Sequence, residues 1–430
     1  MTLTGRAALA AVAGAVVVLA LGSMTALLMV NAVILAAIVA DLVLAASPAR
    51  LRVSRSGDRR VHLAESGSVT LTIVNEGRRA LRGVVRDGWL PSAGSRPARA
   101  RVALAPGAAG QVVTSLTPRR RGDLAGGPVT VRCYGPLGLA ARQRDLTAPW
   151  TVRVLPRFLS RRHLPEKLAR LRDLDGRHPS LLRGQGSEFD SLRAYVLGDD
   201  VRSIDWRSTA RRGDVLVRTW RPERGRRIVI VLDTGRTSAG RVGDIPRLDA
   251  AMDAVLLLAA LAVRAGDRVD LIAADRRIRT RVSGVDRGAL LVTLTTELAM
   301  IEPDLVESSV EVMAAAVLAA ARQRCLVVLM TDLDPAAIEQ GLLPRLPLLT
   351  ARHQVVVAAV ADPRVAEMAG GRDSAQAVYQ AAAAARARGR RAQAGALLRG
   401  YGVEVVDAPP DRLPAALADR YLDLKAAGRL

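Results

Sequence analysis

The chain has 430 residues, of which 50% are hydrophobic, 24% are charged and 3% are aromatic. This length suggests about two or three folded units, and the high apolar fraction excludes a disordered chain. With only two cysteines and four histidines, the sequence excludes a disulfide scaffold and disfavours a cysteine- or histidine-ligated metal site. The net charge of +22 is spread along the chain, without the interleaved aromatic residues of single-strand binders. Nucleic acid is therefore a disfavoured partner.

The N-terminal region is almost purely apolar. Between Ala7 and Ala46 the only charged residue is Asp41. Forty helical residues would span about 60 Å, which is twice the ~30 Å hydrocarbon core of a bilayer. We therefore predict a transmembrane helical hairpin within residues 1–48, with a turn at Gly22-Ser23. The alternative is an alanine-rich hairpin buried in a soluble protein.

The charges that flank this block predict its orientation. Arg6 precedes it and several arginines follow it, beginning with Arg50 and Arg52. Positive charge on both sides favours two crossings with both ends in the cytoplasm. The expected location is thus the cell membrane, multi-pass through two helices, with the bulk of the chain cytoplasmic. Asp41 is then expected near the inner interface, within reach of the arginines that follow.

Residues 49–157 have the texture of a β-rich module. The segment Ser68–Asn75 alternates apolar and polar residues, which is typical of a half-buried strand. Similar short segments follow, separated by glycine and proline clusters, at Val102–Leu104, Gln111–Leu116, Val129–Cys133 and Thr151–Leu155. Short strands at this spacing predict a small β-sandwich-like module, which serves binding or spacing rather than catalysis.

Residues 158–225 contain a polar connector and then the most informative stretch of the chain. From Gly186 to Arg211, acids and arginines alternate around scarce aromatic residues. We expect ion pairs between them, with aromatic residues as apolar contacts, in a structural clamp or a partner-binding surface. So many guanidinium groups would keep the carboxylates ionised and poor as proton donors, so catalysis is not expected. The candidate residues are Phe189, Asp190, Arg193, Tyr195, Asp199, Asp200, Arg202, Asp205, Trp206 and Arg211.

This stretch resembles the domain of unknown function 58 family. The family pattern, G-x-x-F-D-x-L-R-x-Y-x-x-G-D-D-x-R-x-I-D-W-x-x-x-A-R, is met at every fixed position from Gly186 to Arg211. The layout is also similar: membrane segments, a β module, the motif and an α/β domain. The resemblance implies no assigned chemistry. It implies association with a MoxR-type AAA+ ATPase and a role in assembly or maturation at the envelope.

Residues 226–430 alternate apolar strands and helices, which predicts a doubly wound parallel sheet with helices on both faces. The first strand, Ile228–Leu232, is a continuous apolar run that ends at Asp233, and a later strand, Cys325–Met330, is followed by Asp332. This placement resembles a von Willebrand factor A domain, whose metal site reads D-x-S-x-S, then a distant Thr and a distant Asp.

The metal motif is degenerate in this chain. Asp233 is followed by Gly235, which lacks a hydroxyl, and by Thr237, which has one. No convincing distant threonine is present, because Thr295 and Thr296 lie in a helical segment. The tentative ligands are thus Asp233, Thr237 and Asp332, and we expect no cofactor, with Mg²⁺ as the alternative.

Together these features predict a non-enzymatic, membrane-anchored adaptor at the cytoplasmic face, with an AAA+ ATPase of the MoxR type as its partner. A magnesium-dependent protein-binding domain is the first alternative, and a nucleic-acid-binding protein is the second. A hydrolase is the least supported, because the sequence shows no Ser-His-Asp set.

Overall fold

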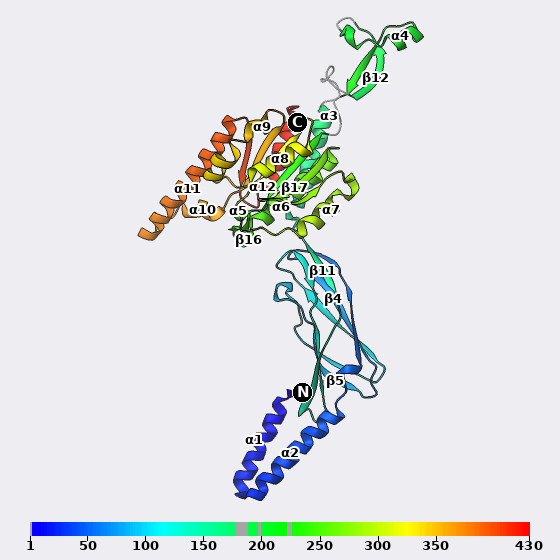
Figure 1. The fold of residues 1–430 in the computed structure, drawn as a ribbon, viewed down its shortest axis with the longest axis vertical. Helices are drawn as coiled ribbons and strands as arrows, with labels where there is room; N and C mark the ends of the chain where they lie inside the picture. Colours follow the sequence, from blue (N-terminus) through cyan, green and yellow to red (C-terminus); the bar gives the residue numbers. More distant parts are fainter. Residues whose placement is uncertain (1, 178–187, 197–198, 222–225) are drawn as a thin grey trace. The chain divides into compact units, whose positions relative to one another are not determined.

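The computed structural model describes residues 2–177, 188–196, 199–221 and 226–430 (Figure 1). The chain forms two compact units, Met1–Leu155 and Pro156–Leu430. The mixed α/β class expected from the sequence is confirmed. Two glycines of the motif, Gly186 and Gly198, lie outside the described residues.

The first unit begins with two apolar helices that lie side by side, α1 (Gly5–Leu21) and α2 (Met24–Leu44) (Figure 1). Gly14 allows the close approach, because a Cβ there would collide with Val30 and Ile34 of α2. The segment Met24–Arg50, with a mean hydropathy of 2.6, is the one helical segment of the described chain long and apolar enough to cross a membrane. The 17-residue α1 is apolar but shorter.

A single turn of the β module contacts both helices at their base. The buried carboxylate of Asp41 in α2 accepts hydrogen bonds from the backbone N–H groups of Leu137 (2.7 Å), Leu139 (2.7 Å) and Ala140 (2.8 Å). The hydroxyl of Thr4, which lies just before α1, donates to the backbone carbonyl of Gly138 in the same turn (2.6 Å). The partners of Asp41 are thus backbone amides and not the arginines that follow α2, where the sequence placed them.

The rest of the first unit consists of β-strands that pack around two apolar clusters. Its sheets have the strand orders β1-β10-β9-β5-β6, β2-β4-β7 and β3-β11-β8. Apolar residues that alternate along β4 and β9, such as Leu71, Ile73 and Val131, are fully buried in the first of these clusters. The strands are β1 (Thr2–Leu3), β2 (Leu51–Gly57), β3 (Arg60–His62), β4 (Gly67–Asn75), β5 (Leu81–Arg86), β6 (Ala100–Leu104), β7 (Ala109–Leu116), β8 (Gly122–Ala125), β9 (Val129–Tyr134), β10 (Ala140–Leu146) and β11 (Thr151–Leu155).

The second unit is built around a six-stranded sheet of order β18-β17-β14-β19-β20-β21. All neighbours are parallel except β18, which pairs antiparallel with β17 at the edge. The apolar run of β14 is buried on both faces, which explains why it lacks alternation. The strands are β14 (Arg227–Asp233), β17 (Arg268–Ala274), β18 (Ile278–Val282), β19 (Leu326–Met330), β20 (Gln354–Val360) and β21 (Glu404–Ala408).

Helices cover both faces of this sheet (Figure 1). One face packs against α3 (Leu164–Arg177), α6 (Arg247–Arg264), α7 (Arg287–Ala299) and α12 (Leu413–Ala426). The other packs against α8 (Val310–Ala320), a π-helical turn (Ala337–Leu342), α9 (Leu346–Thr350) and α11 (Ala375–Gly400). Shorter elements complete the unit: α5 (Arg236–Ala239), β15 (Arg241–Val242), β16 (Ile245–Pro246) and α10 (Pro363–Met368).

The motif forms a small lobe of its own, which we call the motif lobe, residues 188–196 and 199–221. Strands β12 (Glu188–Ala194) and β13 (Leu216–Arg221) pair antiparallel, and α4 (Trp206–Arg212) lies between them in the sequence. Gly213, with a positive φ of 83°, ends α4 in the left-handed conformation that favours glycine.

Candidate functional site

The first predicted site residue at the carboxyl edge of the sheet is Asp233, the last residue of β14. Its carboxylate is buried, and both of its oxygens are engaged. One oxygen accepts from the N–H of Gly235 (2.9 Å) and from the hydroxyl of Ser308, and the other accepts from the hydroxyl of Thr331 (2.7 Å). Three neutral donors therefore hold the carboxylate of Asp233.

Asp332 follows the neighbouring strand β19, and two guanidinium groups hold it. Arg247, at the start of α6, donates to one oxygen (2.6 Å), and Arg391 of α11 donates to the other (2.5 Å). Arg391 also pairs with Asp407 at the end of β21 (2.8 Å). Burial works against the charge of Arg391, but its hydrogen bond to Asp407 and the charge of Asp332 raise its pKa. One arginine thus ties together the carboxyl ends of β19 and β21.

The third tentative ligand, Thr237, contributes differently. It lies in α5, where its carbonyl oxygen receives a long contact from Arg247 (3.4 Å). The hydroxyl groups that reach Asp233 come instead from Ser308 and Thr331. A Cβ at Gly235 would collide with the Ser308 hydroxyl, which therefore occupies the space of the side chain that position 235 lacks.

The distant hydroxyls that the sequence analysis did not find are thus those of Ser308 and of a threonine, Thr331. Ser308 lies in the loop between α7 and α8, while the hydroxyls of Thr295 and Thr296 bond to the backbone of their own helix. Sequence reasoning also missed Arg247 and Arg391. The only sequence signal for Ser308 is its position just before a helix. Its separation of 75 residues from Asp233 gives no local pattern that would link the two.

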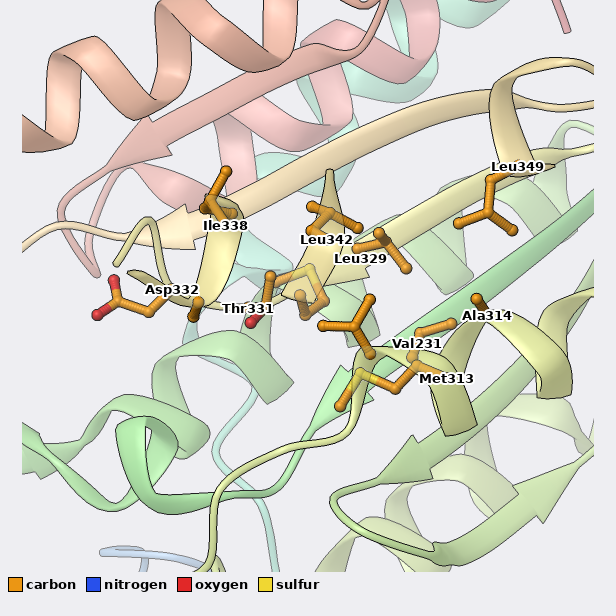
Figure 2. A pocket seen from close by; sticks show the side chains of 12 residues that line it. Val231, Met313, Ala314, Leu329, Thr331, Asp332, Ile338, Leu342 and Leu349 are labelled. Carbon is orange, nitrogen blue, oxygen red and sulfur yellow. The ribbon is translucent and has the colours of Figure 1, made fainter. Parts of the chain in front are cut away.

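The hollow beside these strand ends is small and apolar. It has a volume of about 30 Å³, which is room for roughly one water molecule. Figure 2 shows Val231, Met313 and Leu342 gathered around it, while the carboxylate of Asp332 points away from them. Small-molecule sites usually enclose about 300–1,000 Å³, so this hollow does not accommodate a substrate or an organic cofactor.

In the motif lobe, the first ion pair joins Arg193 to Asp199 (2.5 Å). The second oxygen of Asp199 accepts from the N–H of Val196 (3.0 Å), so the carboxylate also closes a turn. The hydrogen bond to Asp199 raises the pKa of Arg193. This pair fixes the strand end of β12 to the turn that follows it.

A second ion pair fixes the start of α4. Asp205 caps this helix by accepting from the N–H of Ser208 (2.9 Å), and its other oxygen accepts from Arg218 of β13 (2.8 Å). The Ser208 N–H, followed by the Arg218 guanidinium, holds the pKa of Asp205 below its ordinary value. Asp200 similarly caps a short turn through the N–H of Arg202 (2.9 Å).

The remaining motif residues are distributed between the backbone pairing and the surface. Phe189 and Asp190 lie in β12, and the N–H of Tyr195 donates to the carbonyl of Val215 (2.8 Å). Arg202 and Arg211 are exposed. Trp206, at the start of α4, is 67% exposed. Arg218 is not among the candidate residues named from the sequence. It lies in β13, 13 residues after Asp205, and forms the ion pair with that carboxylate.

The geometry of the motif lobe and of the sheet that follows it coincides with a family match. Residues 191–378 match a family described as "Protein of unknown function DUF58". The match begins within β12 and extends through the sheet to α11.

Two curated relatives are the uncharacterized protein Rv1480 of Mycobacterium tuberculosis and the uncharacterized protein Mb1516 of Mycobacterium bovis. Each is 29% identical over 198 residues, which is 45% of this chain. The chain spans about three fifths (61%) of the length of these relatives.

Solved structures show only distant likeness. The CARDB domain of the PF1109 protein from Pyrococcus furiosus is 19% identical, with a TM-score of 0.19, over 24% of this chain and 87% of that chain. A β-glucosidase from Listeria innocua is 19% identical, with a TM-score of 0.15, over 23% of this chain and 16% of that chain. These values carry no functional argument.

Proposed function

We propose that this protein is a non-enzymatic adaptor of the cell membrane, and that its motif lobe binds a protein partner. The observation that carries the proposal is the exposed tryptophan of the motif. The lobe satisfies its acids Asp199 and Asp205 internally, yet it leaves Trp206 67% exposed. Ion pairs within the lobe thus satisfy its charges, and an apolar aromatic side chain remains for contact.

Other exposed apolar side chains of the lobe also support a docking role. Val196 and Val201 are 61% and 62% exposed. Tryptophan is among the residue types that are enriched at the few positions that carry most of the binding energy of a protein interface. The resemblance of the motif to its family makes an AAA+ ATPase of the MoxR type the partner that we propose.

The partner proposal is tested with the full chain, purified in detergent, and a purified MoxR-type ATPase from the same organism. We expect Trp206→Ala to weaken the dissociation constant at least about tenfold, as loss of a hot-spot residue does. Tyr379→Ala is the matched control, since Tyr379 is a 78% exposed aromatic residue of α11 outside the lobe. Equal affinity of wild type and Trp206→Ala, or equal loss in the control, would overturn the proposal.

We further propose that α1 and α2 both cross the bilayer, so that the protein has two spans and a cytoplasmic body. Large apolar side chains on both helices are exposed, including Leu19 (81%), Leu28 (65%) and Val33 (67%). Such a surface is costly in water and favourable in lipid. Arg6 and Arg50 flank the pair and favour a cytoplasmic position for both ends.

The membrane proposal has a direct test in intact cells. Cysteines introduced at position 23, between the helices, and at position 429 are labelled with a membrane-impermeant maleimide. We expect labelling at position 23 only, because it would face the outside. Extraction of the full chain by alkaline carbonate, without detergent, would contradict the anchoring.

The sheet unit is proposed to be von Willebrand A-like and to act without a metal. Asp233 and Asp332 follow neighbouring parallel strands, as the metal ligands of such domains do. Each carboxylate oxygen already accepts a hydrogen bond, and two guanidinium groups neutralise Asp332. Mg²⁺ demands near-octahedral oxygen ligands, and this donor set does not fit it, because Arg247 and Arg391 stand where the positive charge of an ion would act.

A further inference from the structure

A second hollow lies at the amino edge of the six-stranded sheet, where β19, β20 and β21 begin. Its volume is about 420 Å³, within the range typical of small-molecule sites. The residues that line it come from the segments before β19 and β20, from α9 and from the turn after α11. They are Arg324, Pro347, Thr350, Ala351, Arg352, His353, Gln354, Tyr401 and Gly402.

The lining is basic, and its positive charges are not neutralised within the described chain. Of the residues that line the hollow, none is acidic. Neither Arg324 nor Arg352 forms an ion pair with any carboxylate that the structure describes. Glu404 begins the adjacent strand β21, but Arg420 and Arg429 already engage its carboxylate.

His353 adds an unsatisfied buried group to this lining. The residue is 4% exposed, and its Nε2 is buried without a hydrogen-bond partner among the described residues. Its Nδ1 lies 3.3 Å from the Sγ of Cys325. Burial raises the pKa of Cys325 to about 11, so the thiol keeps its proton beside this ring.

Tyr401 supplies an apolar face beside these donors. It follows α11 and is 50% exposed. The phenol ring can stack on a flat organic group, while guanidinium groups match the oxygens of a phosphate in geometry and charge. Inorganic phosphate alone would leave much of the 420 Å³ unfilled.

We propose that this hollow, the amino-edge pocket, binds a small phosphate ester, with Arg324 and Arg352 on the phosphate and Tyr401 against its organic part. The proposal is independent of the adaptor function, because it rests on the opposite edge of the sheet from Asp233 and on residues outside the motif lobe.

The test measures binding of three probes to the full chain in nanodiscs of zwitterionic lipid. The probes are inorganic phosphate, phenyl phosphate and a short-chain phosphatidylglycerol, with thermal unfolding and calorimetry as readouts. We expect both soluble phosphates to raise the Tm and phenyl phosphate to bind more tightly. The double variant Arg324→Ala, Arg352→Ala should lose at least about tenfold in affinity for phenyl phosphate, as loss of charge-assisted hydrogen bonds predicts.

The matched control removes the same charge nearby. Arg322 and Arg399 are exposed and do not line the pocket, so Arg322→Ala, Arg399→Ala should bind like wild type. Tyr401→Ala should reduce the affinity for phenyl phosphate but not for inorganic phosphate. The proposal is overturned if neither soluble phosphate binds, if both double variants lose affinity equally, or if only the lipid headgroup binds.

Discussion

The two edges of the six-stranded sheet differ in how their charges are satisfied. At the carboxyl edge, hydroxyl, amide and guanidinium groups engage Asp233 and Asp332 around a hollow of about 30 Å³. At the amino edge, Arg324 and Arg352 lie without carboxylate partners beside a hollow of about 420 Å³. Ligands of open parallel sheets usually bind at the carboxyl edge. In this chain that edge is closed by its own ion pairs, and the opposite edge offers the unsatisfied groups.

The largest expected effect is at the closed edge. Asp332→Ala should leave two guanidinium groups without their shared carboxylate. Because these side chains are partly buried, we expect a cost above the ~1 kcal/mol of a surface pair and below the ~3–5 kcal/mol of a fully buried one. Native-state hydrogen exchange of the amides at the ends of β19 and β20 measures the loss. Asp411→Ala is the control, because the exposed Asp411 lies 3.9 Å from Arg412 and should cost less than about 0.5 kcal/mol. Equal costs would show that the carboxyl edge is not held by this carboxylate.

A smaller effect is expected at the neighbouring acid. Ser308→Ala removes one hydroxyl donor from Asp233 while other donors remain, so we expect a loss of about 1–2 kcal/mol. Thr293→Ala is the control, since this exposed hydroxyl bonds only to its own helix. Denaturant unfolding of the full chain, followed by exchange at the amide of Gly235, reports the difference. If Ser308→Ala is as mild as the control, the loop does not brace Asp233.

The open edge should show a pH dependence that the closed edge lacks. Burial, followed by the charge of Arg352, lowers the pKa of His353 below 6.5. The unfolded chain therefore binds a proton at a higher pH than the folded chain. The contribution of neutral His353 to the free energy of unfolding is fully present above about pH 6.5 and is lost as the pH falls toward the folded pKa. The Tm of wild type should decline from pH 7 to pH 5.5 more steeply than that of His353→Gln. Parallel curves for the two proteins would contradict this origin.

The smallest expected effect is that of magnesium. Because every carboxylate oxygen of Asp233 and Asp332 is engaged, millimolar Mg²⁺ should change the Tm of wild type by less than about 1 °C. A rise that Asp233→Ala abolishes would mean that a cation displaces the arginines, and the contrast between the two edges would disappear.

Much of the sheet unit could be predicted from the sequence. The continuous apolar run Ile228–Leu232 predicts a buried strand, and β14 confirms it with Arg227–Asp233. Helices alternate with such strands as the sequence predicts, and α6 and α12 are two of them. These elements follow local apolar patterning, which is the part of folding that sequence periodicity records.

The partners of the candidate site could not be predicted in the same way. Ser308, Arg247 and Arg391 reach Asp233 and Asp332 from 75, 85 and 59 residues away, and no local period marks them. The sequence also does not predict several strands of the β module, namely β2, β3, β5, β8 and β10. Of these, β10 is largely exposed and does not alternate. Long-range pairing decides these features, and a single sequence does not show it.

The hydrogen bonds between Asp41 and the turn at residues 137–140 fix the orientation of α2 in the first unit. Three amides converge on a carboxylate that projects from one side of α2, so the helix and the β module share a fixed rotational setting. Each residue of an α-helix turns the next side chain by about 100°. A single alanine inserted between Ile34 and Asp41 would therefore rotate the two parts of α2 relative to each other by about 100°. If Asp41 kept its hydrogen bonds, Val30 and Ile34 would no longer face Gly14 of α1. A rotation of α2 about its axis would therefore be transmitted directly to the strands that follow this turn.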